Sequence, residues 1–267
     1  MANIVLPKKV NFISGEDNSG QIVIEPCYPG YGTTLGNAFR RVLLSSLTGA
    51  AVVGVKFKNA SHEFTTIDNV KEDVLEIILN LKNLRMKIHS DDEEVIKLEL
   101  KSTGEKKVTA KEITKNSNVE IMNPELHIAE VTDKKGELDM EICIAKGTGY
   151  TSIESREESI EKEVGYIDVD SIFSPIKLVK VEIEDVRVSK MTNWEKLIID
   201  IKTDGSIDFK EAFKQSAEIL ENQLSFLLEQ TKEKKKEAKE TKEKEVKVEK
   251  VEEEDKEDKE EKIKEEK

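Results

Sequence analysis

Two groups of carboxylates are the residues of this chain whose spacing comes closest to catalytic chemistry. Asp168 and Asp170 alternate along a predicted strand, so both side chains point to one face, and a second acidic group occupies residues 91–94 in a predicted loop. Phosphoryl transfer by two metal ions needs such carboxylates around ions that lie about 3.5–4 Å apart. Neither group is next to glycine-rich or basic sequence that could receive an anionic substrate. We therefore expect no metal centre at either place.

The other residue types that carry chemistry are present without the spacing that chemistry needs. His62, His89 and His127 are scattered and do not show the spacing of metal ligands. The chain has no G-x-x-x-x-G-K-[ST] phosphate loop and no G-x-S-x-G nucleophile motif. Gly147 and Gly149 form a lone G-x-G, which is more typical of a turn after a strand. We predict a chain with no catalytic residues, no metal and no cofactor of its own.

Arg40 and Arg41 are the remaining candidates, because they are adjacent cations inside an apolar run, residues 31–47. Neighbours on a helix are about 100° apart, so at least one arginine should lie near the edge of the apolar face. There it could hold an acidic group of another protein. Two solvated arginines on a surface helix are the alternative interpretation.

The helix that must position these arginines is predicted from its apolar stripe, which comprises Leu35, Phe39, Val42 and Leu43. Thr33 or Thr34 could cap its first turn, and Gly49 follows where a left-handed residue would close it. Gly36 costs about 1 kcal/mol relative to alanine inside a helix. That cost suggests a close approach by another backbone.

Two further helices and several strands are predicted, which makes the fold class α+β. A second helix begins near Asp68 or Asn69 and carries the stripe Val70, Val74, Ile77, Ile78 and Leu81. Alternating apolar residues predict strands near 22–24, 53–57, 96–100, 138–144, 179–188 and 197–201. The third helix is predicted to begin after Asp208, which could form a capping box with Glu211 three residues on. Its stripe includes Phe209, Phe213, Ala217, Leu220, Leu224, Leu227 and Leu228. So wide a stripe indicates a partner such as a second copy of the chain; burial within one domain is the alternative.

Composition restricts the class of protein. Of the 36 residues from 232 to 267, 14 are lysine and 16 are acidic, which predicts a disordered charged tail. Subtraction from the totals of 43 and 56 leaves 29 basic and 40 acidic residues in 1–231, a net charge of −11 that repels nucleic acid on average. Cys27 and Cys143 form no C-x-x-C pair, and we find no apolar run long enough to span a bilayer. A cytoplasmic protein fits these features.

Several blocks of sequence occur in the order and at the spacing of one known family. They are Thr34-Leu-Gly-Asn-Ala-Phe-Arg-Arg-Val-Leu-Leu-Ser-Ser46, His62-Glu-Phe-Thr-Thr, Val70-Lys-Glu-Asp-Val-Leu-Glu-Ile-Ile-Leu-Asn-Leu-Lys82, Val119-Glu-Ile, Gly147-Thr-Gly-Tyr150, Phe173-Ser-Pro175 and Thr203-Asp-Gly-Ser-Ile-Asp208. Over about residues 1–231 this ordered set resembles the bacterial RNA polymerase alpha subunit. Asp208-Phe209 stands where that family usually has Asp-Pro, and no block resembles its C-terminal DNA-binding domain.

The resemblance implies a discontinuous architecture. Residues 1–48 plus 176–231 would form a dimerisation domain with two main helices on a sheet. A mostly β domain, 49–175, would be inserted between the two halves, and 232–267 would be a tail. The dimer seam would include Leu35, Phe39, Val42, Leu43, Phe213, Leu220, Leu224 and Leu227.

The resemblance also implies the partners. Two copies would bind the beta and beta-prime subunits and meet DNA only through that complex, a nucleotidyltransferase. Arg41, with Arg40, matches the beta-contacting position, and Lys82, Val169 and Ser174 match the beta-prime-facing positions. Structural roles for these residues are the alternative.

Two other functions differ in what they predict. An archaeal or eukaryotic alpha-like subunit would work as a heterodimer, and a chain that sediments alone as a monomer would favour it. An independent enzyme or nucleic-acid-binding protein would be favoured by nucleotide turnover of the isolated chain. An unrelated homodimeric interaction protein is a further alternative.

Overall fold

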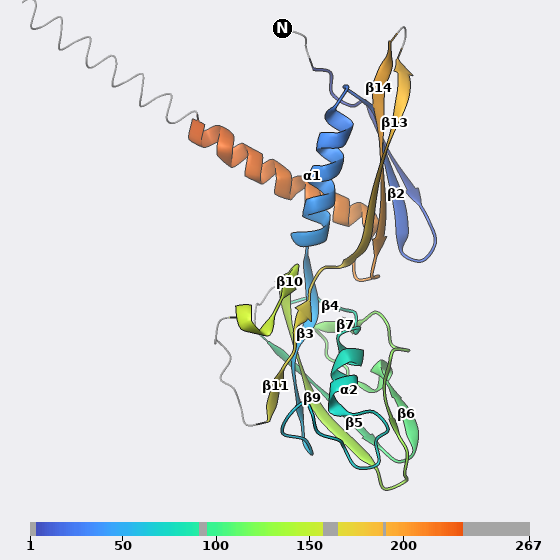
Figure 1. The fold of residues 1–267 in the computed structure, drawn as a ribbon, viewed down its shortest axis with the longest axis vertical. Coiled ribbons are helices and arrows are strands. Elements are labelled where there is room, and N and C mark those ends of the chain that lie inside the picture. The colour runs from blue at the N-terminus through green and yellow to red at the C-terminus, as the bar shows by residue number, and fades with distance from the viewer. Residues whose placement is uncertain (1–3, 91–94, 157–164, 189–190, 232–267) are drawn as a thin grey trace, which may run out of the picture. The chain divides into compact units, whose positions relative to one another are not determined.

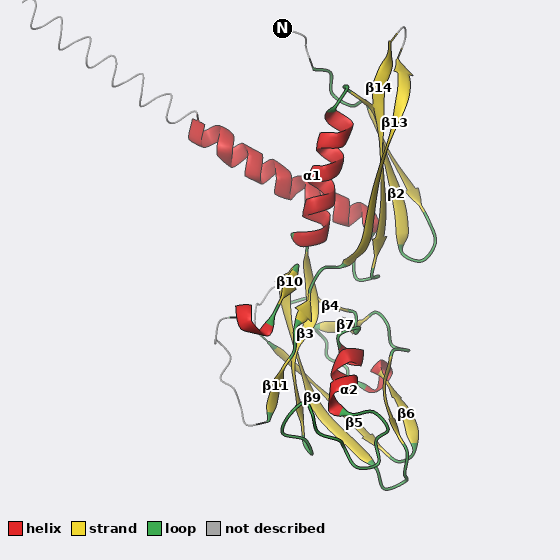
Figure 2. Cartoon of the chain, viewed as in Figure 1, coloured by secondary structure: helices red, strands yellow, loops and turns green. Residues whose placement is uncertain are grey.

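The computed structural model describes residues 4–90, 95–156, 165–188 and 191–231 of the chain. The chain divides into two compact units, residues 1–217 and 218–267. Helices are few and the described strands pair antiparallel, which confirms the predicted α+β class (Figures 1 and 2). The acidic group at 91–94 and the charged tail at 232–267 lie outside the described residues.

One four-stranded sheet of the first unit joins both ends of the folded sequence. Its order is β1 (Lys9–Ser14), β2 (Ser19–Cys27), β14 (Met191–Thr203), β13 (Ile176–Val188). The two central strands supply most of its buried side chains, including Ile22, Leu197, Ile199 and Ile201. Alternation along these strands is local, so the sequence pattern predicts this core well.

Helix α1 (Tyr31–Ser45) packs against β13 and β14 of this sheet (Figure 1). Leu43 is fully buried there, whereas Leu35, Phe39 and Val42 are only partly covered. A Cβ on Gly36 would lie 2.6 Å from Cγ1 of Val181. The glycine is therefore needed for close contact with sheet side chains, which corrects the expectation that it approaches another backbone.

Neither end of α1 is capped as predicted. The helix begins after Gly30, whose φ is 84°, and the Thr34 hydroxyl donates to the Gly30 carbonyl instead of accepting from a free N–H group. The carboxylate of Glu195 on β14 accepts from Gly30 N at 2.7 Å and from Gly32 N at 2.8 Å. Gly49 lies in β3, beyond the helix, and a Cβ there would meet the Phe173 carbonyl oxygen at 1.8 Å. Strand packing, not helix termination, requires this glycine.

A second four-stranded sheet has the order β11 (Tyr166–Asp168), β3 (Thr48–Phe57), β9 (Glu137–Thr148), β5 (Ile96–Thr103). Helix α2 (Val74–Leu81) buries Val74, Ile77, Ile78 and Leu81 in the same core cluster as this sheet. Three short ladders complete the region: β4 (Met86–Ile88) with β7 (Val119–Ile121), β6 (Lys106–Thr109) with β8 (His127–Val131), and β10 (Tyr150–Thr151) with β12 (Ser171–Ile172). Two 3₁₀ turns, η1 (Ala110–Glu112) and η2 (Ile153–Ser155), lie between strands.

Helix α2 is shorter than its apolar stripe predicts. Asn69 has a φ of 62°, which a helix cannot contain, and Asp73 caps the helix by accepting from Glu76 N at 2.7 Å. Val70 belongs instead to a single bridge with Val131. The apolar residues before Asp73 that continue the helical spacing therefore lie in a loop.

The C-terminal helix occupies residues 209–231 and crosses the boundary between the two units. In the first unit Phe209 and Ala212 are buried, and the Phe213 ring lies 4.7 Å from that of Phe39 on α1. In the second unit, taken by itself, Leu224 and Leu227 are 60% and 59% exposed. This stretch has an apolar side that its own unit does not cover.

Candidate functional site

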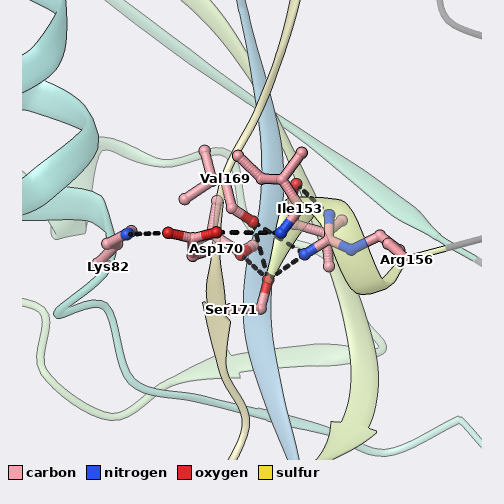
Figure 3. Close-up of polar contacts among 8 residues, drawn as sticks. Lys82, Ile153, Arg156, Val169, Asp170 and Ser171 are labelled. Carbon is pink, nitrogen blue, oxygen red and sulfur yellow. Dashed lines mark hydrogen bonds and ion pairs between the residues drawn. The ribbon is translucent and has the colours of Figure 1, made fainter. Parts of the chain in front are cut away.

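A polar junction around Asp170 joins three segments that are distant in sequence (Figure 3). Lys82, the residue that ends α2, donates from Nζ to Asp170 Oδ2 at 3.3 Å. The backbone N–H of Ile153, the first residue of η2, donates to Asp170 Oδ1 at 3.0 Å. The Ile153 N–H group, together with the Lys82 ammonium, outweighs the effect of burial and holds the pKa of the Asp170 carboxyl below its ordinary value. Both groups of the ion pair are about 30% exposed, so they face the surface.

A second set of contacts lies beneath this junction and centres on Arg156 (Figure 3). The guanidinium donates to the Val53 carbonyl at 2.7 Å, to the Val169 carbonyl at 2.9 Å and to Ser171 Oγ at 2.8 Å. The Ser171 hydroxyl donates in turn to the Val52 carbonyl at 2.7 Å. Side chains therefore satisfy backbone carbonyls at the place where β11 has ended and β12 has not begun.

Burial alternates along the segment that carries Asp170. Val169, Ser171 and Phe173 are 1%, 1% and 6% exposed, so they point inward. Asp170 and Ser174 are partly exposed and Ile172 is 42% exposed, so these residues point outward. Exposed apolar side chains adjoin them. Ile153 is a neighbour because its backbone N–H is hydrogen-bonded to Asp170, and Tyr150 is paired with Ile172 in the β10–β12 ladder. The junction presents a mixed polar and apolar surface.

The predicted beta-prime-facing residues fall into different places. Lys82 contacts Asp170, the residue that follows Val169. The Val169 side chain itself is buried, and only its neighbours reach the surface. Ser174 is partly exposed, and its backbone N–H donates to the Gly149 carbonyl at 3.2 Å. Sequence reasoning weighed Asp170 only as a metal ligand and did not single out Arg156 at all. The alternate spacing of Asp168 and Asp170 was the available signal for an outward carboxylate.

The two arginines of α1 are both exposed, in the second half of that helix. Among the residues that the structure describes, neither forms an ion pair with an acidic side chain. An unpaired guanidinium at a surface is available to a carboxylate of another protein, because it can form two parallel hydrogen bonds with it. The arrangement fits the docking interpretation and equally permits solvated side chains.

The predicted dimer-seam residues also divide by exposure. Leu43 is 0% exposed and packs in the core of its own chain, so its side chain cannot line a seam. The other predicted members, Leu35, Phe39, Val42, Phe213, Leu220, Leu224 and Leu227, are partly or largely exposed. The apolar stripe of α1 thus serves its own sheet on one side and leaves the other side open.

The three histidines contact side chains or backbone rather than one another. His127 Nε2 donates to Glu72 at 2.8 Å, His89 lies 3.3 Å from Glu120, and His62 contacts Thr65. In the described parts of the chain, no group of three or more His, Cys, Asp or Glu side chains is arranged to hold a metal ion. Across the same residues, no helix is long and apolar enough to cross a bilayer.

Comparison with known proteins gives one consistent result. Residues 55–174 match the family described as the RNA polymerase Rpb3/RpoA insert domain. The chain is 46% identical to a DNA-directed RNA polymerase subunit alpha of Desulforamulus reducens, over 87% of this chain and 73% of that protein. It is 45% identical to the protein of the same name from Symbiobacterium thermophilum, again over 87% and 73%. For the Macrococcus caseolyticus protein the identity is 44%, over 83% of this chain and 69% of the relative.

Proposed function

We propose that this chain, which belongs to the family of bacterial DNA-directed RNA polymerase alpha subunits, is a homodimeric scaffold on which the large subunits of the polymerase assemble. The polymerase as a complex is an enzyme that transfers nucleotides. We assign no step of that chemistry to residues of this chain. It would act in the cytoplasm and reach DNA only through the assembled complex.

The open apolar side of the C-terminal helix is the observation that carries this proposal. Leu224, Leu227 and Leu228 are each 59–60% exposed and lie three and four residues apart, so they share one face of a continuous helix. Contiguous apolar surface of this kind is typical of a protein interface, and a second copy offers the same surface in return. In the first unit, the partly covered rings of Phe39 and Phe213, whose centroids are 4.7 Å apart, are the corresponding candidates for the seam.

The two large partners would bind at separate places. Arg41, supported by Arg40, would bind a carboxylate of the beta subunit, because both arginines are exposed and a guanidinium suits that contact. Lys82 and Ser174 would face the beta-prime subunit. Val169 would support that surface from below, since its own side chain is buried.

The domain boundaries belong to the same proposal. We assign 1–48 plus 176–231 to dimerisation and 49–175 to an inserted domain. The match of 55–174 to the insert-domain family supports this division, as do the two separate sheets. The boundary of the two compact units, at 217/218, instead lies within the C-terminal helix, between its covered start and its more exposed end.

Arg41→Ala tests the beta contact. Loss of a guanidinium from the centre of a protein interface costs about 2 kcal/mol or more, so affinity for purified beta subunit should fall by more than about tenfold. Binding of the purified dimer to beta can be measured by titration calorimetry. Lys107→Ala, an exposed cation on β6, is the matched control and should change affinity by less than about twofold. Unchanged beta binding by Arg41→Ala would remove the assigned role.

A further inference from the structure

Strand β3 has an irregular stretch where its carbonyl groups need unusual partners. Its register with β9 shifts between Val52 and Gly54. On its other side β11 ends at Asp168, although Val169 N still donates to the Val53 carbonyl at 3.0 Å. An extra residue in a strand redirects the carbonyls around it, and buried carbonyls require donors. Here side chains add to that backbone donor: Arg156 also donates to the Val53 carbonyl, and the Ser171 hydroxyl donates to the Val52 carbonyl.

Arg156 joins β3 to the neighbouring segment through one rigid group. Its guanidinium reaches β3 at Val53 and the 169–171 segment at both Val169 and Ser171. A guanidinium is planar with five fixed N–H donors, so it can bind three acceptors at once, which a lysine ammonium on a flexible stem does less well. The side chain therefore fastens two segments of chain to each other.

The turn η2 is consequently held at both of its ends. Ile153 at its start donates to Asp170, and Arg156 directly after its end donates to Val169 and Ser171. With Val169 and Ser171 fixed inward, alternation turns Asp170 and Ile172 outward. Lys82 then meets Asp170 at 3.3 Å. One partly buried cation thus determines where the exposed side chains of two segments lie.

We propose that Arg156 is a positioning residue for the beta-prime-facing surface, and that this surface extends from Lys82 to the exposed apolar side chains of Tyr150, Ile153 and Ile172. Arg156 itself does not contact the partner. It keeps η2 and the 169–172 segment in register, so that the Lys82–Asp170 pair and the apolar side chains form one surface for a polypeptide partner. The inference rests on the beta-prime role proposed above.

The experiment compares Arg156→Ala and Arg156→Lys with Lys82→Ala in the full-length dimer already bound to beta. Affinity for purified beta-prime should fall by at least about tenfold in Arg156→Ala and about as far in Arg156→Lys. Without the fixed guanidinium the contacting side chains can shift by about 1 Å, and a displacement of that size is enough to weaken a binding site. Lys107→Ala, a matched surface cation, should stay within about twofold. Dimerisation and beta binding should not change in either Arg156 variant.

Four readouts separate positioning from a general loss of structure. In Arg156→Lys the Ile153 amide should exchange faster with solvent, and the pKa of the Asp170 carboxyl, followed by NMR, should rise towards its ordinary value. The thermal midpoint should stay close to that of the wild type. The double variant with Lys82→Ala should bind beta-prime no more weakly than the weaker single variant, because Lys82 acts only when Asp170 is in place.

The possible outcomes are distinct. If Lys82→Ala weakens beta-prime binding and Arg156→Lys does not, the positioning role is wrong and the proposed function stands. If neither variant weakens binding, the beta-prime surface itself is misassigned and both proposals fall. If Arg156→Ala does not fold, Arg156→Lys decides alone: a clear fall in affinity supports the role, and affinity within about twofold of wild type overturns it.

Discussion

Single carboxylates hold distant segments of this chain together. The two oxygens of Glu195 accept from the N–H groups of Gly30, just before α1, and of Gly32, in its first turn, at 2.7 and 2.8 Å. Asp170 likewise accepts from Ile153 with one oxygen and from Lys82 with the other. A carboxylate suits these positions because it has two acceptor atoms and a negative charge, which the N-terminal end of a helix favours. The shift in register between Glu195 and Leu197 accompanies the Glu195 contact and directs its side chain towards α1.

Glu195→Gln should destabilise the protein although the side chain keeps its size. One carboxamide oxygen replaces two carboxylate oxygens, so one first-turn N–H group of α1 loses its acceptor and the helix loses a favourable charge. The loss of a helix cap costs about 1 kcal/mol. Urea unfolding at neutral pH would measure this difference. Glu184→Gln, which loses an exposed ion pair with Lys196, is the control and should change stability little. Equal effects of the two substitutions would contradict the capping role.

The contacts of Glu195 and Arg156 explain what the sequence could not predict. Thr33 and Thr34 are the obvious candidates for capping α1, since caps are usually local, but the acceptor is 163 residues away from Gly32. Arg156 likewise reaches a carbonyl 103 residues away. Local periodicity carries no information about such contacts. By contrast the strands around Ile22, Ile142 and Ile199 were predictable, because alternating burial depends only on near neighbours.

At the scale of elements, α2 is fixed by contacts on either side of its sequence. Glu72, just before the helix, accepts from His127 Nε2 at 2.8 Å and from Glu130 N at 2.7 Å, both near or in β8. Asp73 then caps the first turn. These two acids explain why the helix begins at Val74 and why Lys82 emerges at its end, where it meets Asp170. The apolar stripe alone could not locate that start.

The anchor at Glu72 makes part of the stability depend on pH. Burial works to raise the pKa of this carboxyl, but the hydrogen bonds from His127 and Glu130 outweigh it and hold the pKa below the ordinary value of 4.5. Since the folded pKa is the lower one, the contribution is fully present above pH 4.5 and is lost as pH falls through the folded pKa. Glu72→Gln should therefore cost about 1–2 kcal/mol at pH 7, and the deficit should shrink towards pH 3.

Urea unfolding of wild type and Glu72→Gln at a series of pH values would test this anchor. The exposed residue Glu76→Gln, one turn further on, serves as the control for charge alone. A deficit for Glu72→Gln that stayed constant down to the lowest pH would contradict a contribution from the ionised carboxyl.

At the scale of the whole molecule, the apolar stripes of the helices have two different uses. Helical spacing predicted that Leu43 and Leu224 lie on apolar faces, and both do. It could not tell that Leu43 packs on its own sheet with 0% exposure whereas Leu224 is 60% exposed. That distinction depends on which elements lie nearby, which periodicity does not encode. The exposed stripe is the one for which we propose a partner.

The exposed stripe predicts the oligomeric state of the chain. The double variant Leu224→Glu and Leu227→Glu would place carboxylates in a dimer seam, where burying them unpaired costs several kcal/mol. The dissociation constant of the dimer should therefore rise by at least about a hundredfold. Sedimentation equilibrium over a concentration series would measure that change. Glu218→Gln and Glu221→Gln, which alter charge on the same helix without adding buried carboxylates, form the control pair.

Because both leucines are already about 60% exposed in the single chain, the double variant should keep the folded sheets of residues 1–217, and its circular dichroism should resemble that of wild type. A wild-type chain that sediments as a monomer at all concentrations would contradict the homodimer and would favour a heterodimeric partner for the same helix.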